Sequence, residues 1–312
     1  MVIGLDAGGT KLLGASLGEG LELGPRVRHT WAGEGRDATL EVIARAVEDI
    51  RAQAGDVDAV GLGVPSLVDW DDGVSRWSNH LPLDDLPLRD LMTKRLGLPV
   101  VVDNDGNLAV LAEHREGAAR DSRNAVFLAM GTGIGGGLVL DGKVYRGSHG
   151  YAGEFGHMVV DHDGADCPGA CPGRGCLEAL ASGRAIGVAG ERAARDAPDS
   201  ALGRRFAESG AVLGQVVTEL AHEGDEAARA VLADVGRRLG AGLTGIVNAL
   251  DPDVVVIGGG AVTAGDLLLD PAREVVEARA LPPVARAVRI VPARFGEEAG
   301  LIGAGLLARE LM

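Results

Sequence analysis

The chain has 312 residues and 46% of them are hydrophobic, which is enough for two compact domains or one large domain with a sizeable core. Thirty Lys and Arg against 45 Asp and Glu give a formal net charge of −15. This balance argues against a nucleic-acid partner, because such binding relies on basic side chains that neutralise phosphates. The sequence has no terminal apolar stretch long enough to span a bilayer, so we expect a soluble, cytoplasmic protein without a membrane partner.

Strands and helices are predicted to alternate along the first third of the chain. The predicted elements are a hairpin of residues 2–5 and 12–17, a helix over 39–53, a strand over 57–65, a helix over 88–96, a strand over 99–105 and a helix over 106–116. The hairpin encloses the glycine turn DAGGTK. The buried strand PVVVDND ends in acidic residues.

The rest of the chain continues this alternation. Residues 125–145 form an apolar run, the glycine turn MGTGIGGG and a second apolar run, which weakly repeats the opening hairpin. A long helix over 224–250, a buried strand over 251–262 that runs into three glycines, and a closing helix over 300–312 follow. The alternation of strands with helices throughout predicts an α/β protein.

Three predicted strands end in glycine-rich turns: Gly8-Gly9-Thr10, Gly131–Gly137 and Gly258-Gly259-Gly260. Glycine lets backbone N–H groups approach and point at an anion. Thr10 and Thr132 add hydroxyl donors, and Asp6 and Lys11 bracket the first turn. The set predicts a polyphosphate held between two domains; the alternative is tight hairpin turns with no ligand.

Two other nucleotide motifs are disfavoured. Gly131, Gly133 and Gly136 match the pattern GxGxxG, but the strand-like segment GLVLDGKVY follows them. A Rossmann turn must instead open a helix, whose N-terminus holds the pyrophosphate. This argues against NAD, and the absence of GxxxxGK[ST] excludes a Walker-type loop.

Carboxylates cluster where a predicted strand ends. The segment VVDNDGN places Asp103, Asn104 and Asp105 at the C-terminal end of a strand, where α/β proteins usually build their sites. A carboxylate there can accept the proton of a hydroxyl that attacks a phosphoryl group, and Asn104 can bind sugar hydroxyls. Alternatively, these residues only cap the next helix. Downstream, Glu154 and Glu178 also suit vicinal diols.

All three cysteines lie within ten residues of one another. His157, Cys167, Cys171 and Cys176 have the spacing H-x9-C-x3-C-x4-C, and one His with three Cys makes a closed, structural zinc site. We expect zinc to order this Gly- and Pro-rich loop and so to position His157 and Glu178 at the substrate. The alternative is three reduced thiols in a mobile loop.

These motifs resemble those of the ROK family of bacterial sugar kinases, over essentially the whole chain. The resemblance rests on LDAGGTK, VVDNDGNLAVLAE, MGTGIGGG, RGSHGYAGEFGHMVV with CPGRGCLE, and VVVIGGG. It implies the actin-like ATPase fold of hexokinases and heat-shock-type proteins, with two α/β domains and a cleft between them. Residues 1–116 would form a small N-terminal domain, on which a closing helix of about 300–312 packs back. Residues 117–299 would form a larger domain with the zinc loop 157–176.

The resemblance also implies an activity: MgATP-dependent phosphorylation of a hexose at its 6-hydroxyl, with glucose as the expected sugar, by a homodimer or homotetramer. N-acetylmannosamine, mannose, fructose and allose are alternative sugars, and polyphosphate is an alternative donor. The family also contains sugar-responsive repressors. Those add an N-terminal helix-turn-helix, and because the sequence begins at the first phosphate strand we expect a kinase and not such a repressor.

Roles carry over from the family residue by residue. Asp105 aligns with the general base. The implied hexose ligands are Ser66, Asn79, Asn104, Asp105, Glu154, His157 and Glu178. The implied nucleotide ligands are Asp6 (through Mg²⁺), Gly8, Gly9, Thr10, Lys11, Gly131, Thr132, Gly133, Gly135, Gly259 and Gly260. The implied zinc ligands are His157, Cys167, Cys171 and Cys176.

Two departures from the family pattern touch these sites. Three residues separate Cys167 from Cys171, where the family usually has one. Pro65 is followed by Ser66, where the family usually has Gly, so we expect a hydroxyl to face the sugar.

Overall fold

The computed structural model describes residues 1–31, 35–78 and 80–312. The chain forms two compact units. Unit 1 consists of Met1–Asp121, Gly137–Gly153 and Glu297–Met312, and unit 2 consists of Ser122–Gly136 and Glu154–Gly296. Strands and helices alternate in both, which confirms the predicted α/β class.

The sheet of unit 1 has five strands in the order β3-β2-β1-β4-β7. These are β3 (Leu23–Thr30), β2 (Lys11–Leu17), β1 (Val2–Ala7), β4 (Ala59–Val64) and β7 (Val100–Asn104). The strands β1, β4 and β7 are parallel, whereas β2 and β3 run antiparallel to their neighbours. The hairpin predicted around the first glycine turn is therefore confirmed as β1–β2.

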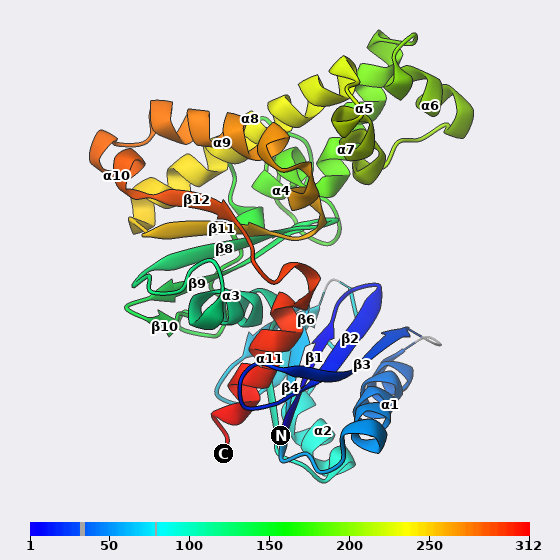
Figure 1. Ribbon diagram of the computed structural model, residues 1–312, viewed down its shortest axis with the longest axis vertical. Helices are drawn as coiled ribbons and strands as arrows, with labels where there is room; N and C mark the ends of the chain where they lie inside the picture. Colours follow the sequence, from blue (N-terminus) through cyan, green and yellow to red (C-terminus); the bar gives the residue numbers. More distant parts are fainter. Residues whose placement is uncertain (32–34, 79) are drawn as a thin grey trace. The chain divides into compact units, whose positions relative to one another are not determined.

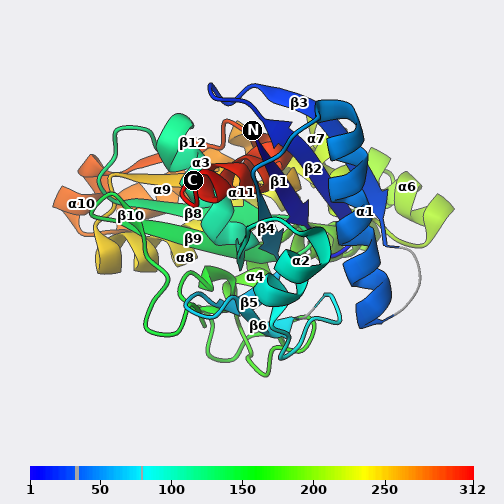
Figure 2. The same ribbon diagram turned by 90° about the horizontal axis from the view of Figure 1, so that it is seen from below.

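The two faces of this sheet are separated by the alternation of side chains along each strand. Residues such as Ile3 and Leu62 lie in the core formed with α1 (Arg36–Ala54) and α2 (Leu88–Leu96). These two helices lie beside each other in Figure 2. Val2 and Val101 point to the opposite face, where the core includes residues of α3 (Asp105–Glu116) and α11 (Ala299–Arg309).

Helix α11 lies directly on the sheet, alongside β1 and β4 (Figure 1). The residues beneath it are glycines. A Cβ added at Gly4 would overlap the carbonyl oxygen of Leu301, and one added at Gly61 would overlap the carbonyl oxygen of Ala304. On its other side α11 contacts α3, where a Cβ at Gly303 would overlap the carbonyl oxygen of Leu108. The helix backbone can therefore approach only because these residues have no side chain.

Unit 1 also contains a small two-stranded sheet that the sequence did not predict. It pairs β5 (Ser66–Asp69) with β6 (Val74–Ser78) in antiparallel fashion. The strand β5 continues from β4 after Pro65 and carries Ser66.

The second sheet has the order β10-β9-β8-β11-β12, formed by β10 (Lys143–Val144), β9 (Ile134–Leu140), β8 (Ala125–Met130), β11 (Val254–Gly258) and β12 (Arg289–Pro292). The strands β8, β11 and β12 are parallel. The helices of unit 2 are α4 (Leu177–Ala181), α5 (Gly183–Asp196), α6 (Ala201–Ser209), α7 (Gly214–His222), α8 (Glu226–Leu250), α9 (Asp266–Arg279) and α10 (Pro282–Ala287).

Short 3-10 helices complete the chain: η1 (Phe155–His157), η2 (Gly260–Ala264) and η3 (Gly296–Glu298). In unit 2, α8 and α9 pack closely, and a Cβ added at Gly236 would overlap the carbonyl oxygen of Leu268. Within the described ranges, none of the helices combines the length and the apolar character that crossing a membrane requires.

The contact between α11 and β4 yields a stability prediction. We expect Gly61→Ala to lower the free energy of unfolding by about 3 kcal/mol, because the added methyl group overpacks a backbone-to-backbone contact. Gly20→Ala is the matched control, since no atom lies within 4 Å of a Cβ added at Gly20. Urea unfolding followed by circular dichroism measures both variants. Equal stability of Gly61→Ala and the control would contradict the packing described.

Candidate functional site

Asn104 organises the acidic end of β7 in unit 1. Its side-chain oxygen accepts hydrogen bonds from the backbone N–H groups of Gly106 (2.8 Å) and Asn107 (3.2 Å), so Asn104 is the N-cap of α3. Its amide nitrogen donates to the carbonyl oxygen of Ser66 at 3.2 Å. The capping that the sequence allowed for Asp103 or Asp105 is therefore performed by Asn104, whose amide keeps one N–H for another acceptor.

Two carboxylic acids of unit 1 titrate near neutral pH. Burial, with a smaller contribution from the charge of Asp105, raises the pKa of Asp6 to about 7, although Lys11 opposes the shift. Burial likewise raises the pKa of Asp105 to about 6, opposed by the Gly106 N–H group and by His80. A carboxylate with a pKa close to the working pH is suited to proton transfer. Asp105 is therefore chemically competent as a general base.

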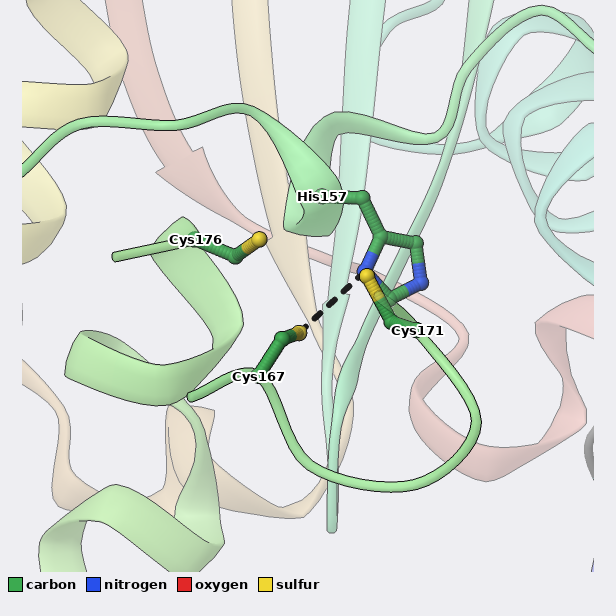
Figure 3. A group of neighbouring side chains, drawn as sticks. All are labelled: His157, Cys167, Cys171 and Cys176. Atoms are coloured by element: carbon green, nitrogen blue, oxygen red, sulfur yellow. Dashed lines mark hydrogen bonds between the residues drawn. The ribbon is translucent and has the colours of Figure 1, made fainter. Parts of the chain in front are cut away.

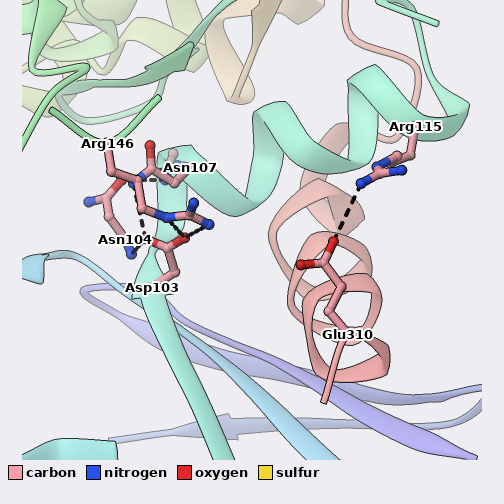
Figure 4. A network of polar contacts seen from close by, with 7 residues as sticks. Asp103, Asn104, Asn107, Arg115, Arg146 and Glu310 are labelled. Carbon is pink, nitrogen blue, oxygen red and sulfur yellow. Dashed lines mark hydrogen bonds and ion pairs between the residues drawn. The ribbon is translucent and has the colours of Figure 1, made fainter. Parts of the chain in front are cut away.

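A third acid, Asp103, is instead firmly paired (Figure 4). Its side chain is 2% exposed, and the Nε and Nη2 atoms of Arg146 both lie 2.8 Å from its Oδ2. Its Oδ1 accepts from the Asn104 backbone N–H (2.8 Å) and from the Asn107 side chain (3.0 Å). The Arg146 guanidinium stacks 3.6 Å above the Trp70 ring. Asp103 therefore fixes the backbone that carries Asn104 and Asp105.

Sequence reasoning missed Arg146, although one signal was available. A charge at the end of a buried strand requires a counter-ion, and Arg146 opens the segment RGSHGYAGEFGH. Figure 4 also shows Arg115 of α3 paired with Glu310 at 3.4 Å beyond the end of α11. Both of those side chains are exposed, so this ion pair contributes little.

The first glycine turn joins β1 to β2. Gly9 and Thr10 are exposed, whereas Gly8 is half-buried and its carbonyl oxygen accepts from the Trp31 indole N–H at 3.0 Å. The Lys11 Nζ atom lies 2.7 Å from Glu297 Oε2. The turn thus presents an exposed backbone beside the acid Asp6.

The second and third glycine turns follow the neighbouring parallel strands β8 and β11 of unit 2. In the second turn, Thr132 is exposed and the Gly131 N–H donates to the Gly133 carbonyl oxygen at 2.9 Å. In the third turn, Gly259 adopts a φ of 79°, which favours glycine, and packs against the backbone of Met130. The two turns therefore lie beside each other at one edge of the sheet.

His157, Cys167, Cys171 and Cys176 come together in unit 2, as their spacing predicted (Figure 3). Their candidate ligand atoms all lie within 4.8 Å of one another. The His157 Nδ1 and Cys167 Sγ atoms are 3.5 Å apart. Zinc bonds of typical length in a tetrahedron place a nitrogen and a sulfur ligand about 3.6 Å apart. The arrangement therefore fits zinc, and it includes Cys167 despite the unusual spacing.

Two thiols of this cluster, those of Cys167 and Cys176, resist ionisation without a cation. Burial raises the pKa of Cys167 and of Cys176, and Cys171 adds to both shifts, whereas a hydrogen bond with Cys167 partly opposes the shift of Cys176. A bound Zn²⁺ reverses this preference, because it deprotonates the thiols that coordinate it.

His157 faces two neighbours with its two ring nitrogens. Nδ1 faces Cys167, while Nε2 lies 3.9 Å from Glu154 Oε2. A metal-bound histidine commonly directs its second nitrogen at a carboxylate. One imidazole can therefore bind the metal through Nδ1 and a polar ligand through Nε2.

The predicted site residues are distributed over both units. Unit 1 contains Asp6, Gly8, Gly9, Thr10, Lys11, Ser66, Asn104 and Asp105, and unit 2 contains Gly131, Thr132, Gly133, Gly135, Glu154, His157, Glu178, Gly259 and Gly260 with the three cysteines. Asn79 lies outside the described residues. Ser66 is buried, and its hydroxyl has no hydrogen-bond partner among the residues that are described.

Comparison with known proteins places these features in a family. The chain matches the ROK family over residues 2–311. It is 36% identical over 256 residues to a glucokinase from Halalkalibacterium halodurans, covering 82% of this chain and 77% of that relative.

Two solved structures resemble it over 99% of this chain. One is a ROK family glucokinase from Streptomyces griseus in complex with glucose and AMPPNP, with 32% identity, a TM-score of 0.88 and 99% of that chain covered. The other is a ROK family transcriptional regulator homologous to the E. coli MLC protein, with 28% identity, a TM-score of 0.89 and 78% of that chain covered. The predicted actin-like ATPase fold is thereby confirmed, and the chain belongs to the ROK family.

Proposed function

We propose that the protein is an ATP-dependent hexose kinase that phosphorylates glucose at its 6-hydroxyl. The observation that carries the proposal is Asp105, a carboxylic acid with a pKa of about 6 at the start of α3, next to the fixed amide of Asn104. The glucokinase relatives, and the glucose and AMPPNP bound in the Streptomyces griseus structure, support the choice of sugar and donor.

Asp105 would act as the general base. Its carboxylate would accept the proton of the 6-hydroxyl while that oxygen bonds to the γ-phosphorus of ATP and the bond to the bridging β,γ-oxygen breaks, so that ADP leaves. The hexose ring would be bound by the side chains of Ser66, Asn79, Asn104, Glu154, His157 and Glu178. Holding the two reactants in this way removes much of the entropic cost of the reaction.

The nucleotide would bind to the three glycine turns. Its phosphates would be contacted by Gly8, Gly9, Thr10, Lys11, Gly131, Thr132, Gly133 and Gly135, with Gly259 and Gly260 beside the adenosine. Asp6 fits an interaction with Mg²⁺ through water, because it is an acid with an elevated pKa next to a second acid. Mg²⁺ would neutralise charge on the phosphates.

Zinc would order the loop that carries the cysteines. His157, Cys167, Cys171 and Cys176 supply one nitrogen and three sulfur ligands, the donor set of a closed structural site. The reduced thiols fit our proposal of a cytoplasmic protein. From the family resemblance we also propose that it assembles as a homodimer or homotetramer.

The function is tested by measuring ADP release with MgATP and each of five sugars: glucose, mannose, fructose, allose and N-acetylmannosamine. We expect kcat/KM for glucose to exceed the others by at least about tenfold, which corresponds to about 1.4 kcal/mol of transition-state discrimination. Preference for another sugar would support the hexose kinase activity but contradict the proposal that glucose is the substrate. Binding of sugar without turnover, even with polyphosphate as donor, would instead support a sensing role like that of the family's regulators.

Asp105→Asn should reduce kcat by about 10²–10⁴, because the amide cannot accept the hydroxyl proton. We expect the affinity for the hexose, measured by calorimetry, to change little. Asp56→Asn is the matched control, since Asp56 is an exposed acid of the same unit. A kcat close to that of the control would rule out Asp105 as the base.

The zinc proposal predicts about one zinc per chain after purification without chelator. Cys176→Ser should lose that zinc and melt at a lower temperature, because the loop would no longer be cross-linked. His162→Ala is the control, since His162 is exposed in the same loop but lies outside the four-residue cluster. Elemental analysis and thermal melting check both variants; a Cys176→Ser protein with full zinc content would refute the ligand set.

A further inference from the structure

The second glycine turn is held by a side chain that the proposed function assigns to the sugar. The backbone N–H of Ile134 donates a hydrogen bond of 2.7 Å to Glu178 Oε2. Ile134 is buried, so this N–H would otherwise lack a partner away from water. The contact is close enough that a Cβ at Gly133 would overlap the same carboxylate oxygen. Glu178 therefore fixes the backbone of the turn at residues 133–134.

Two further contacts fix the turn from other sides. The carbonyl oxygen of Ile134 lies against Gly156, where an added Cβ would overlap it. The carbonyl oxygen of Gly131 accepts a hydrogen bond of 2.8 Å from the N–H of Gly183, the first residue of α5. Three neighbouring segments of unit 2 therefore determine the position of this turn.

Those segments carry the proposed zinc and hexose ligands. Gly156 stands between Glu154 and His157 in sequence, and Glu178 lies in the first turn of α4, two residues after Cys176. Cys176 and Val159 also form an antiparallel bridge, which joins the two segments directly. A change in either segment on binding sugar would therefore reach the turn that is proposed to bind phosphate.

The carboxylate of Glu178 has one oxygen available for a second partner. Oε2 is used by Ile134, whereas no described residue donates a hydrogen bond to Oε1. An ionised carboxylate accepts through both oxygens. A hexose hydroxyl can therefore bind Oε1 without displacing the turn from Oε2.

We propose that Glu178 couples the binding of hexose to the binding of nucleotide, by accepting a sugar hydroxyl at Oε1 while Oε2 positions the second glycine turn for the phosphates. This inference rests on the proposed kinase function. Glu178 is then a positioning residue for the nucleotide as well as a ligand of the sugar. Because coupling between two ligands is reciprocal, each must raise the affinity for the other by the same factor.

Calorimetric titrations of the full chain test the coupling. AMPPNP with Mg²⁺ is titrated with and without saturating glucose, and glucose is titrated with and without AMPPNP. In the wild type we expect each ligand to raise the affinity of the protein for the other by a factor of about ten, within the usual range of such couplings. In Glu178→Ala the factor should fall to about one. AMPPNP should then bind several-fold more weakly even without sugar, because the turn has lost its anchor.

Two further variants separate positioning from sugar contact. In Glu178→Gln the amide oxygen can still accept from Ile134, so affinity for AMPPNP alone should largely recover, whereas the coupling factor should fall towards one, because the amide nitrogen cannot accept the sugar hydroxyl in place of Oε1. Glu154→Gln should weaken glucose binding and leave AMPPNP binding without sugar unchanged. Zinc content and thermal melting confirm that each variant is folded, and Glu178→Gln tests the proposal even if Glu178→Ala does not fold.

The possible failures are distinguishable. If wild-type protein binds both ligands but with a factor of one, the coupling is refuted while the kinase proposal stands. If Glu178→Ala or Glu178→Gln retains the wild-type factor, Glu178 is not the coupling residue. If the wild type binds neither glucose nor AMPPNP, the proposed function itself fails and this inference fails with it.

Discussion

The close contact between the backbone of α11 and the sheet of unit 1 is the constraint on which the acidic site depends. Gly4 and Gly61 leave room for the helix where any side chain would collide with it. The approach places Gly300 of α11 against Asp6, where an added Cβ would lie 2.6 Å from a carboxylate oxygen. It also packs α11 on α3, the helix that Asp105 begins. The packing of α11 therefore contributes to the burial of Asp6, and burial is the largest cause of the elevated pKa values of Asp6 and Asp105.

The burial of Asp6 and Asp105 lowers the stability of the folded state by an amount that depends on pH. The folded-state pKa values of Asp6 and Asp105 lie above the ordinary value of 3.8. The folded state therefore favours their protonated forms, and the associated stability is present below about pH 4 and is lost as the pH rises through about 6 to 7. At neutral pH the ionised acids oppose folding, and a bound cation would offset that effect. Burial raises the pKa of Asp103 as well, but Arg146 and two amide donors oppose this shift and stabilise its charge.

Local sequence patterns predicted most of the secondary structure and of the candidate site. The features that they did not predict depend mainly on contacts between residues far apart in the sequence. Apolar runs and their periodicity predicted the parallel strands and α8, and the glycine clusters predicted the turns. Residue types and spacing predicted the metal cluster. The edge strand β3 was missed because its residues LGPRVRHT are half-exposed and include a proline. The partners of Asp103 and Glu178 were missed because Arg146 and Ile134 lie 43 and 44 residues away in sequence. Such pairs depend on the tertiary fold, which composition and spacing do not specify.

The proposed chemistry depends on an acid whose pKa is raised by burial, and the pH dependence of kcat/KM for the preferred hexose tests this most directly. This parameter reports the ionisation of groups in the free enzyme. We expect a plateau above about pH 8, where both acids are ionised, and a loss of activity as the pH falls through the values of about 7 for Asp6 and about 6 for Asp105. A kcat/KM that stays constant down to about pH 4.5, as an ordinary aspartate with a pKa near 3.9 would allow, would contradict it.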